Sequence, residues 1–287
     1  MKFIQLYKKA LLISTLVLLS ACSSEESLTA SILDTTKPQQ SELDVWIGQI
    51  YLTPYNIEVL YKWNQNLVDG NRYLYPPTQT KIKPALEIVQ RIWLNTYTTI
   101  GGSKFVKLIA PRQLVLVGGV NLNSTGTKTL GEAEGGQRIT LFETDYVDKT
   151  DRESVKQFIH TIQHEYIHIL NQHKPFDEKS FAKITPTGYT ANWYETKDAE
   201  ANEEGFITAY AKSNIIEDFA EMASMMLVNS KDEYEAIIAG ITNPKAQSDI
   251  RAKEALVVKY FKEAFNIDFY KLRAEAEKNT ADVIAGN

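Results

Sequence analysis

Short apolar stretches separated by polar turns mark the first half of the chain. Residues alternate between apolar and polar over Asn56–Tyr61 and again over Arg138–Phe142, which predicts two strands with one covered face. Gln113–Val117 is a continuous apolar run that ends at two glycines, so we expect a buried strand there. Apolar side chains recur at helical spacing between Lys81 and Tyr97. Residues 119–136, rich in Gly, Asn, Ser and Thr, are expected to form a loop.

The pattern turns helical from about Asp151 and stays so for most of the remaining chain. Apolar positions three and four residues apart predict a helix that ends near Gln172. Similar patterns follow at 196–204, 214–229, 231–241, 246–265 and 268–278. Strands with helices, followed by helices, predict one α+β domain with a mostly helical second half.

The first 21 residues have the layout of a bacterial secretory signal. Three lysines precede the apolar run Ala10–Leu19, which is too short to span a bilayer, and two small residues follow it. The next residue, Cys22, is the only cysteine of the chain. Leu19–Cys22 resembles the bacterial lipoprotein signal, in which the cysteine is acylated and becomes the new N-terminus, and several acyl chains would anchor the protein stably. A plain secreted protein is the alternative.

These features predict a signal peptide at 1–21, a flexible tether at 22–42 and a folded domain at 43–287. The serine and acidic residues of Ser23–Glu26 resemble surface-export sequences of Bacteroidetes lipoproteins. We therefore expect a lipoprotein of the outer membrane, exposed on the cell surface and held there through Cys22.

Composition and charge narrow the classes of function. Hydrophobic residues make up 44% and charged residues 23% of the 287 residues, as in a globular protein with a substantial core. The net charge is −5, and loss of residues 1–21, which contain three lysines, takes it to about −8. An acidic chain without a basic stripe is not expected to bind nucleic acid. A single cysteine excludes an internal disulfide.

The four histidines of the chain all lie within fourteen residues, at positions 160, 164, 168 and 173. Within this cluster, His164-Glu165-Tyr166-Ile167-His168 fits the pattern H-E-x-x-H, and it falls inside the helix predicted above. Residues four apart share a helix face, so His164 and His168 can converge on one zinc ion, with Glu165 beside a water molecule. Chance spacing of surface histidines is the alternative.

A catalytic zinc site has three protein ligands, so a third must come from elsewhere. The extended pattern H-E-x-x-H-x-x-G-x-x-H is excluded because Asn171 and Lys174 occupy its glycine and third histidine positions. His173 suits the C-terminal end of the helix. His160, one turn before His164, is either a structural histidine or a hydrogen-bonding neighbour of the ligands.

A carboxylate from a later helix fits better. Glu217 and Glu221 share one face of an apolar helix, where two carboxylates are costly unless something positive meets them. We assign Glu217 as the third ligand and expect Glu221 to accept a hydrogen bond from a ligating imidazole. The alternative is that Glu217 and Glu221 belong to a solvated acidic face of a surface helix. Glu200, Glu203 and Glu204 are rival candidates for the third ligand.

These residues resemble those of the zinc metallohydrolase lipoproteins of Bacteroidetes, a family associated with outer-membrane nutrient import. The resemblance covers about residues 45–270. It rests on His164–His168 with Tyr210–Lys212 and Glu217–Glu221, and on Val59–Trp63, Pro76-Pro77, Ile92-Trp93 and Gly205–Ile207. The same Tyr, Glu and Glu spacing is similar to the catalytic domain of anthrax lethal factor, a zinc peptidase.

The resemblance implies a zincin-like fold, in which a small mixed sheet packs on the H-E-x-x-H helix. It implies that zinc is bound by His164, His168 and Glu217 and that Glu165 acts as general base. It also implies that the Tyr210 hydroxyl assists catalysis by stabilising an oxyanion. In zincins an edge strand before this helix pairs with an extended substrate, and Arg138–Phe142 is the candidate here.

Three functions remain open at this point. The first is an active zinc peptidase acting on peptides or proteins, with outer-membrane import components as further partners. The second is a surface lipoprotein that captures peptides or glycans and has a structural or inactive metal site. The third is a zinc hydrolase of another bond, such as an amide in a glycoconjugate. An intact Glu165 argues against the second, because a structural site needs no general base.

Overall fold

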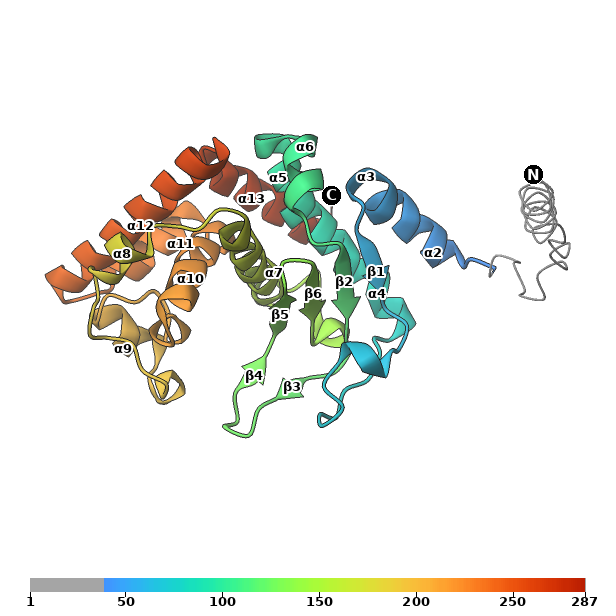
Figure 1. Ribbon diagram of the computed structural model, residues 1–287, viewed down its shortest axis with the longest axis horizontal. Coiled ribbons are helices and arrows are strands. Elements are labelled where there is room, and N and C mark those ends of the chain that lie inside the picture. The colour runs from blue at the N-terminus through green and yellow to red at the C-terminus, as the bar shows by residue number, and fades with distance from the viewer. Residues whose placement is uncertain (1–38, 287) are drawn as a thin grey trace, which may run out of the picture. The chain divides into compact units, whose positions relative to one another are not determined.

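The computed structural model describes residues 39–286, and the compact unit begins at Ser41 (Figure 1). The predicted signal peptide, Cys22 and most of the predicted tether lie outside the described residues. In the described part of the chain, no helix is long and apolar enough to cross a membrane.

A four-stranded mixed sheet forms the β layer. Its strands are β1 (Glu58–Leu60), β2 (Gln113–Leu116), β5 (Gly131–Glu134) and β6 (Arg138–Leu141), in the order β1-β2-β6-β5. The first three strands in this order are parallel, and β5 is antiparallel to β6. Gly135 and Gly136, with φ of 55° and 68°, make the tight turn between β5 and β6, which side chains would hinder.

The structure confirms the three predicted strands and corrects two predictions about their surroundings. Arg138–Phe142 was the predicted edge strand, but β6 is internal, because β2 pairs with one side of it and β5 with the other. Residues 119–136 are not one loop. They contain β5 and a small hairpin of β3 (Asn121–Leu122) and β4 (Lys128–Thr129). The sequence did not predict these strands because glycine and polar residues take the place of an alternating apolar pattern.

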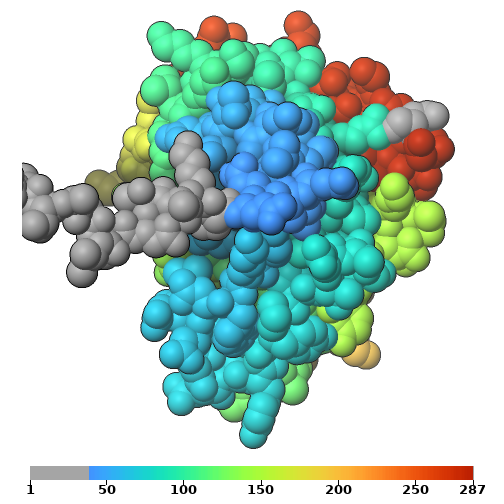
Figure 2. Space-filling view, turned by 90° about the vertical axis from the view of Figure 1, so that its right-hand side faces the viewer, coloured from blue at the N-terminus to red at the C-terminus, as the bar shows by residue number. Residues whose placement is uncertain are grey.

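Helical segments before β2 contribute much of the face of the molecule that Figure 2 shows. The predicted helix from Lys81 to Tyr97 is confirmed within a longer helical stretch. The segments are α2 (Glu42–Ile47), α3 (Thr53–Tyr55), α4 (Gln79–Ile88), α5 (Asn95–Gly101) and α6 (Ser103–Ile109), with π-helical turns at Gly48–Leu52 and Val89–Leu94.

The second half is helical, as predicted, and its first helix is central to the fold. Asp151 caps this helix, α7 (Arg152–His173), which packs against β5 and β6 on one side and α10 on another (Figure 1). Tyr166 of α7 meets Trp93 and Tyr97 edge to face, with ring centres 5.1 and 4.9 Å apart. The later helices are α8 (Glu178–Ala182), α9 (Asp198–Glu203), α10 (Ile215–Val228), α11 (Lys231–Ala239), α12 (Pro244–Phe265) and α13 (Phe269–Ile284).

Candidate metal centre

Two helices bring three predicted ligands together. His164 and His168 lie one turn apart on α7, and Glu217 lies in the first turn of α10. The Asn214 side chain fixes this turn by accepting a hydrogen bond from the Glu217 backbone N–H at 3.1 Å. Oε2 of Glu217 lies 2.9 Å from Nε2 of His164 and 3.2 Å from Nε2 of His168. The two Nε2 atoms are 3.0 Å apart.

This donor set fits a zinc ion. Two nitrogens and one carboxylate oxygen lie within 4.8 Å of one another. Ligands bound to zinc at tetrahedral angles are about 3.3 Å apart, close to the distances seen here. Only 18% of the Glu217 side chain and 3% of the Glu221 side chain are exposed, so the alternative of a solvated acidic face is wrong.

The pKa values of these groups reflect the close contacts. Burial lowers the pKa of His164, but the hydrogen bonds with Glu217 and Glu221 outweigh it and raise this pKa to about 10. Burial raises the pKa of Glu217, but its hydrogen bonds with His164 and His168 outweigh it and lower this pKa to about 2. At neutral pH His164 and Glu217 therefore share a proton, and a metal ion must displace this proton in order to bind.

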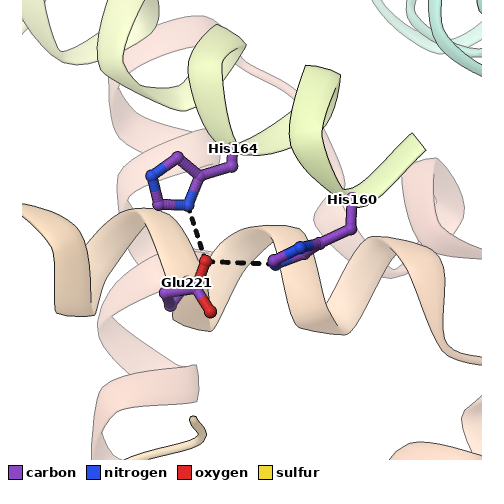
Figure 3. A group of neighbouring side chains, drawn as sticks. All are labelled: His160, His164 and Glu221. Carbon is purple, nitrogen blue, oxygen red and sulfur yellow. Dashed lines mark ion pairs between the residues drawn. The ribbon is translucent and has the colours of Figure 1, made fainter. Parts of the chain in front are cut away.

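Glu221, which was predicted to accept a hydrogen bond from a ligating imidazole, lies beside the other ring nitrogen of His164. Its Oε1 lies 2.7 Å from Nδ1 of His164 and 3.1 Å from Nε2 of His160 (Figure 3). The Thr208 hydroxyl donates a hydrogen bond to the other oxygen at 2.6 Å. Thr208 precedes the short helix at Tyr210–Lys212, and nothing in the sequence pattern pointed to it.

Glu165 lies between the metal centre and the edge strand β5. It is buried beside Gly131, where an added Cβ would meet Thr161 Cγ2 at 2.6 Å and Glu165 Cγ at 3.0 Å. The glycine therefore lets β5 pass close to α7. The Ala133 backbone N–H hydrogen-bonds to the Glu165 carboxylate, and burial raises the pKa of this carboxyl group above its usual value.

Tyr210 faces the same centre. Its ring centre lies 5.7 Å from that of His164 and 4.8 Å from that of Trp193. Burial raises the pKa of Tyr210, and the carboxylates of Glu217, Glu165 and Glu221 raise it further. The hydroxyl therefore stays protonated at neutral pH and can donate a hydrogen bond.

Two adjoining cavities open beside these residues. The smaller, about 340 Å³, is lined by Gly131, His164, Glu165 and Tyr210 among others, and the larger is about 760 Å³. Leu130, Trp193 and Tyr210 line both. From the sequence, Trp193 was expected to pack in the core, with sugar stacking as the alternative, because a lone tryptophan in an irregular segment carries no positional signal.

A buried ion pair holds the helix that carries Glu217. Lys253 of α12 lies 2.6 Å from Asp218, and both side chains are fully buried. The Tyr189 hydroxyl donates a hydrogen bond to the same Asp218 oxygen at 2.9 Å, and Lys253 donates one to the Gly205 carbonyl at 2.8 Å. The pair ties the start of α10 to α12 and to the segment before Tyr210.

The rival carboxylates are engaged elsewhere. Glu203 accepts hydrogen bonds from Thr242 and Asn243, and Glu204 pairs with Lys212. Glu200 accepts a hydrogen bond from the backbone N–H of Lys197 at the start of α9. His173 is the last residue of α7, as expected.

Comparison with known proteins agrees with this geometry. No curated protein matches the chain. A crystal structure described as a "putative zinc-binding metallo-peptidase" from Bacteroides caccae matches with a TM-score of 0.71 and 31% sequence identity, over 88% of this chain and 97% of that one. The model of the family with the same description matches residues 36–270. The chain therefore belongs to this family of zinc-binding metallo-peptidases.

Proposed function

We propose that this protein is a zinc-dependent peptidase with a zincin-like catalytic domain, in which His164, His168 and Glu217 bind the metal. The observation that carries the proposal is the convergence of these three donors beside the buried carboxylate of Glu165. A purely structural zinc site is closed by four ligands, whereas three ligands beside a cavity and a general base are typical of catalysis.

The residues around the centre suit peptide hydrolysis. A zinc ion bound there supplies Lewis acidity, which polarises a carbonyl and makes a water molecule more acidic. The Glu165 carboxylate takes the proton from the attacking water and passes it to the leaving amine. The protonated Tyr210 hydroxyl donates a hydrogen bond to the oxyanion that develops on the carbonyl.

The edge of the sheet offers a place for the substrate backbone. Within the described residues β5 pairs only with β6, so no strand pairs with its outer edge, and Glu165 lies beside β5 and accepts a hydrogen bond from the Ala133 backbone N–H. An extended peptide that pairs with this edge would place its carbonyl groups near the centre. In this proposal β5, and not Arg138–Phe142 as predicted from the sequence, is the edge strand that pairs with the substrate. The adjoining cavities have room for side chains of several substrate residues.

The test is zinc content and cleavage of a peptide library by the full chain purified in detergent. Glu217→Ala should lose the zinc that the wild type binds, about one per chain. Glu165→Gln should keep its zinc and lose about 10²-fold to 10⁴-fold in kcat. Zinc retained in full by Glu217→Ala would move the third ligand. Zinc binding without peptide cleavage would favour a binding lipoprotein, or a hydrolase of another amide.

We also propose that a lipid on Cys22 holds the domain at the outer surface of the outer membrane, where it works with nutrient-import components. The signal-like segment before Cys22 and the Ser23–Glu26 sequence support this proposal. Metabolic labelling with an alkyne fatty acid should mark the wild type and not Cys22→Ser. Equal labelling of both would refute the anchor.

A further inference from the structure

Glutamates on α10 and histidines on α7 alternate across the contact between the two helices. Glu217 meets His164 and His168, while Glu221, one turn later, meets His160 and His164. His164 therefore lies between two carboxylates, and each of its ring nitrogens faces one of them. The proposed function uses the contact with Glu217, but it gives His160 no role.

From this arrangement we propose that His160 is a positioning residue for the metal centre, acting through Glu221 on His164. The inference rests on the proposed function, because it takes His164 as a zinc ligand. His160 and His164 reach the same oxygen of Glu221 (Figure 3). Thr208 donates a hydrogen bond to the other oxygen. Two ring nitrogens at close distance and one hydroxyl hydrogen bond therefore hold this carboxylate in position.

The hydrogen bonds determine which nitrogen of His164 can bind a metal. An ionised carboxylate only accepts hydrogen bonds, so Nδ1 of His164 carries the proton at its 2.7 Å contact with Glu221. Nε2 is then the nitrogen that can bind zinc, beside His168 and Glu217, once the metal displaces the proton that Nε2 shares with Glu217. Hydrogen-bond partners of this kind fix the tautomer and the ring orientation of a ligating histidine.

Glu221 can do this only if its own charge is stabilised. The residue is 2% exposed, and a carboxylate removed from water is costly unless donors surround it. Without His160, Glu221 keeps only the donors from His164 and Thr208, and its hold on the His164 proton weakens. A histidine that served packing alone could be replaced by any side chain of similar volume.

A second metal ion between the same residues is the competing explanation. His160, His164 and Glu221 also lie close enough together to bind one. That site would need a lone pair on Nδ1 of His164, but a neutral imidazole has one lone pair, and the first site uses it on Nε2. We therefore expect one zinc ion per chain.

The test measures the zinc dissociation constant of the full chain, purified in detergent, by competition with a chromogenic chelator. His160→Leu removes the donor at similar volume and should raise the constant about tenfold, near the lower limit for such partners. His160→Gln restores an N–H donor and should recover most of the affinity. Glu221→Ala should raise the constant about 10-fold to 100-fold. In the Glu221→Ala background, His160→Leu should add nothing, because its effect passes through Glu221.

The outcomes distinguish a failure of the proposed function from a failure of the inference about His160. No zinc binding by the wild type would overturn the proposed function and this inference with it. Wild-type affinity in a folded His160→Leu, or equal losses with and without Glu221, would overturn this inference alone, as would two zinc ions per chain. If His160→Leu fails to fold, Thr208→Val removes the other outer donor to Glu221. It should raise the constant severalfold, and wild-type affinity in this variant would overturn the inference.

Discussion

Replacement of Lys253 by methionine removes one half of the buried ion pair and leaves Asp218 buried, with a hydrogen bond from the Tyr189 hydroxyl. At 2.6 Å and an effective dielectric constant of about 20, the lost attraction is about 6 kcal/mol. Asp218 avoids part of this loss by binding a proton, which at pH 7 costs about 4 kcal/mol relative to an ordinary aspartate. We therefore expect the free energy of unfolding to fall by about 3–5 kcal/mol, as for other broken buried pairs.

The pH dependence gives this prediction a second, independent check. Burial raises the pKa of Asp218 to about 6 even beside Lys253. A raised pKa in the folded state means that stability is lost as pH rises from the unfolded value through the folded one. In Lys253→Met the pKa rises further, so the variant should keep losing stability above about pH 7, where this group is almost fully ionised in the wild type and affects its stability little. The difference between the two proteins should therefore be smaller at pH 5.5 than at pH 7.5.

The assay is urea unfolding of both proteins at the two pH values, with a chelator present so that metal binding does not contribute. The double variant Asp218→Asn with Lys253→Met contains no buried charge at this site and should regain at least half of the lost stability. A loss below about 1 kcal/mol at pH 7.5, or an equal loss at both pH values, would refute the reasoning.

Three further predictions concern the centre itself. Zinc binding at pH 7.5 should release about one proton from His164, because hydrogen bonds raise its pKa to about 10, whereas an ordinary histidine would release about 0.1. A zinc-bound water with a pKa of about 7 would add a further fraction of a proton. Titration calorimetry in buffers of different ionisation enthalpy measures the total, and a total below about one would contradict the prediction. Gly131→Ala should cost about 1–3 kcal/mol in urea unfolding, because the added Cβ would meet Thr161 at 2.6 Å, and an unchanged midpoint would show that β5 can move aside. Tyr210→Phe should lower kcat by about 10²-fold with zinc content unchanged, and unchanged kinetics would remove its hydroxyl from the mechanism.

The sequence predicted the parts of the centre that depend on local periodicity. His164 and His168 share a face because they are four residues apart on a helix, and the same holds for Glu217 and Glu221. The alternation at Arg138–Phe142 predicted a strand correctly, but it could not show which strands lie beside it. β5, with the sequence Gly-Glu-Ala-Glu, has no hydrophobic pattern, because one of its edges and much of its surface face solvent.

Other parts of the centre depend on contacts between distant segments. Thr208 reaches Glu221 across 13 residues, and Lys253 reaches Asp218 across 35. Trp193 lies beside Tyr210, and Tyr210 beside His164 of α7, although these residues come from different segments of the chain. No spacing rule connects such positions, so single-sequence analysis could not find them.

The metal ligands and the two aromatic residues of the cavity wall, Trp193 and Tyr210, belong to different parts of the chain. His164, His168 and Glu217 lie on two packed helices, whereas Trp193 and Tyr210 lie on the segment that joins these helices, between Lys174 and Asn214. Surface connections tolerate insertions and exchanges far better than packed helices do. Related chains can therefore diverge in what they cut by rebuilding this connection while they inherit the metal centre unchanged.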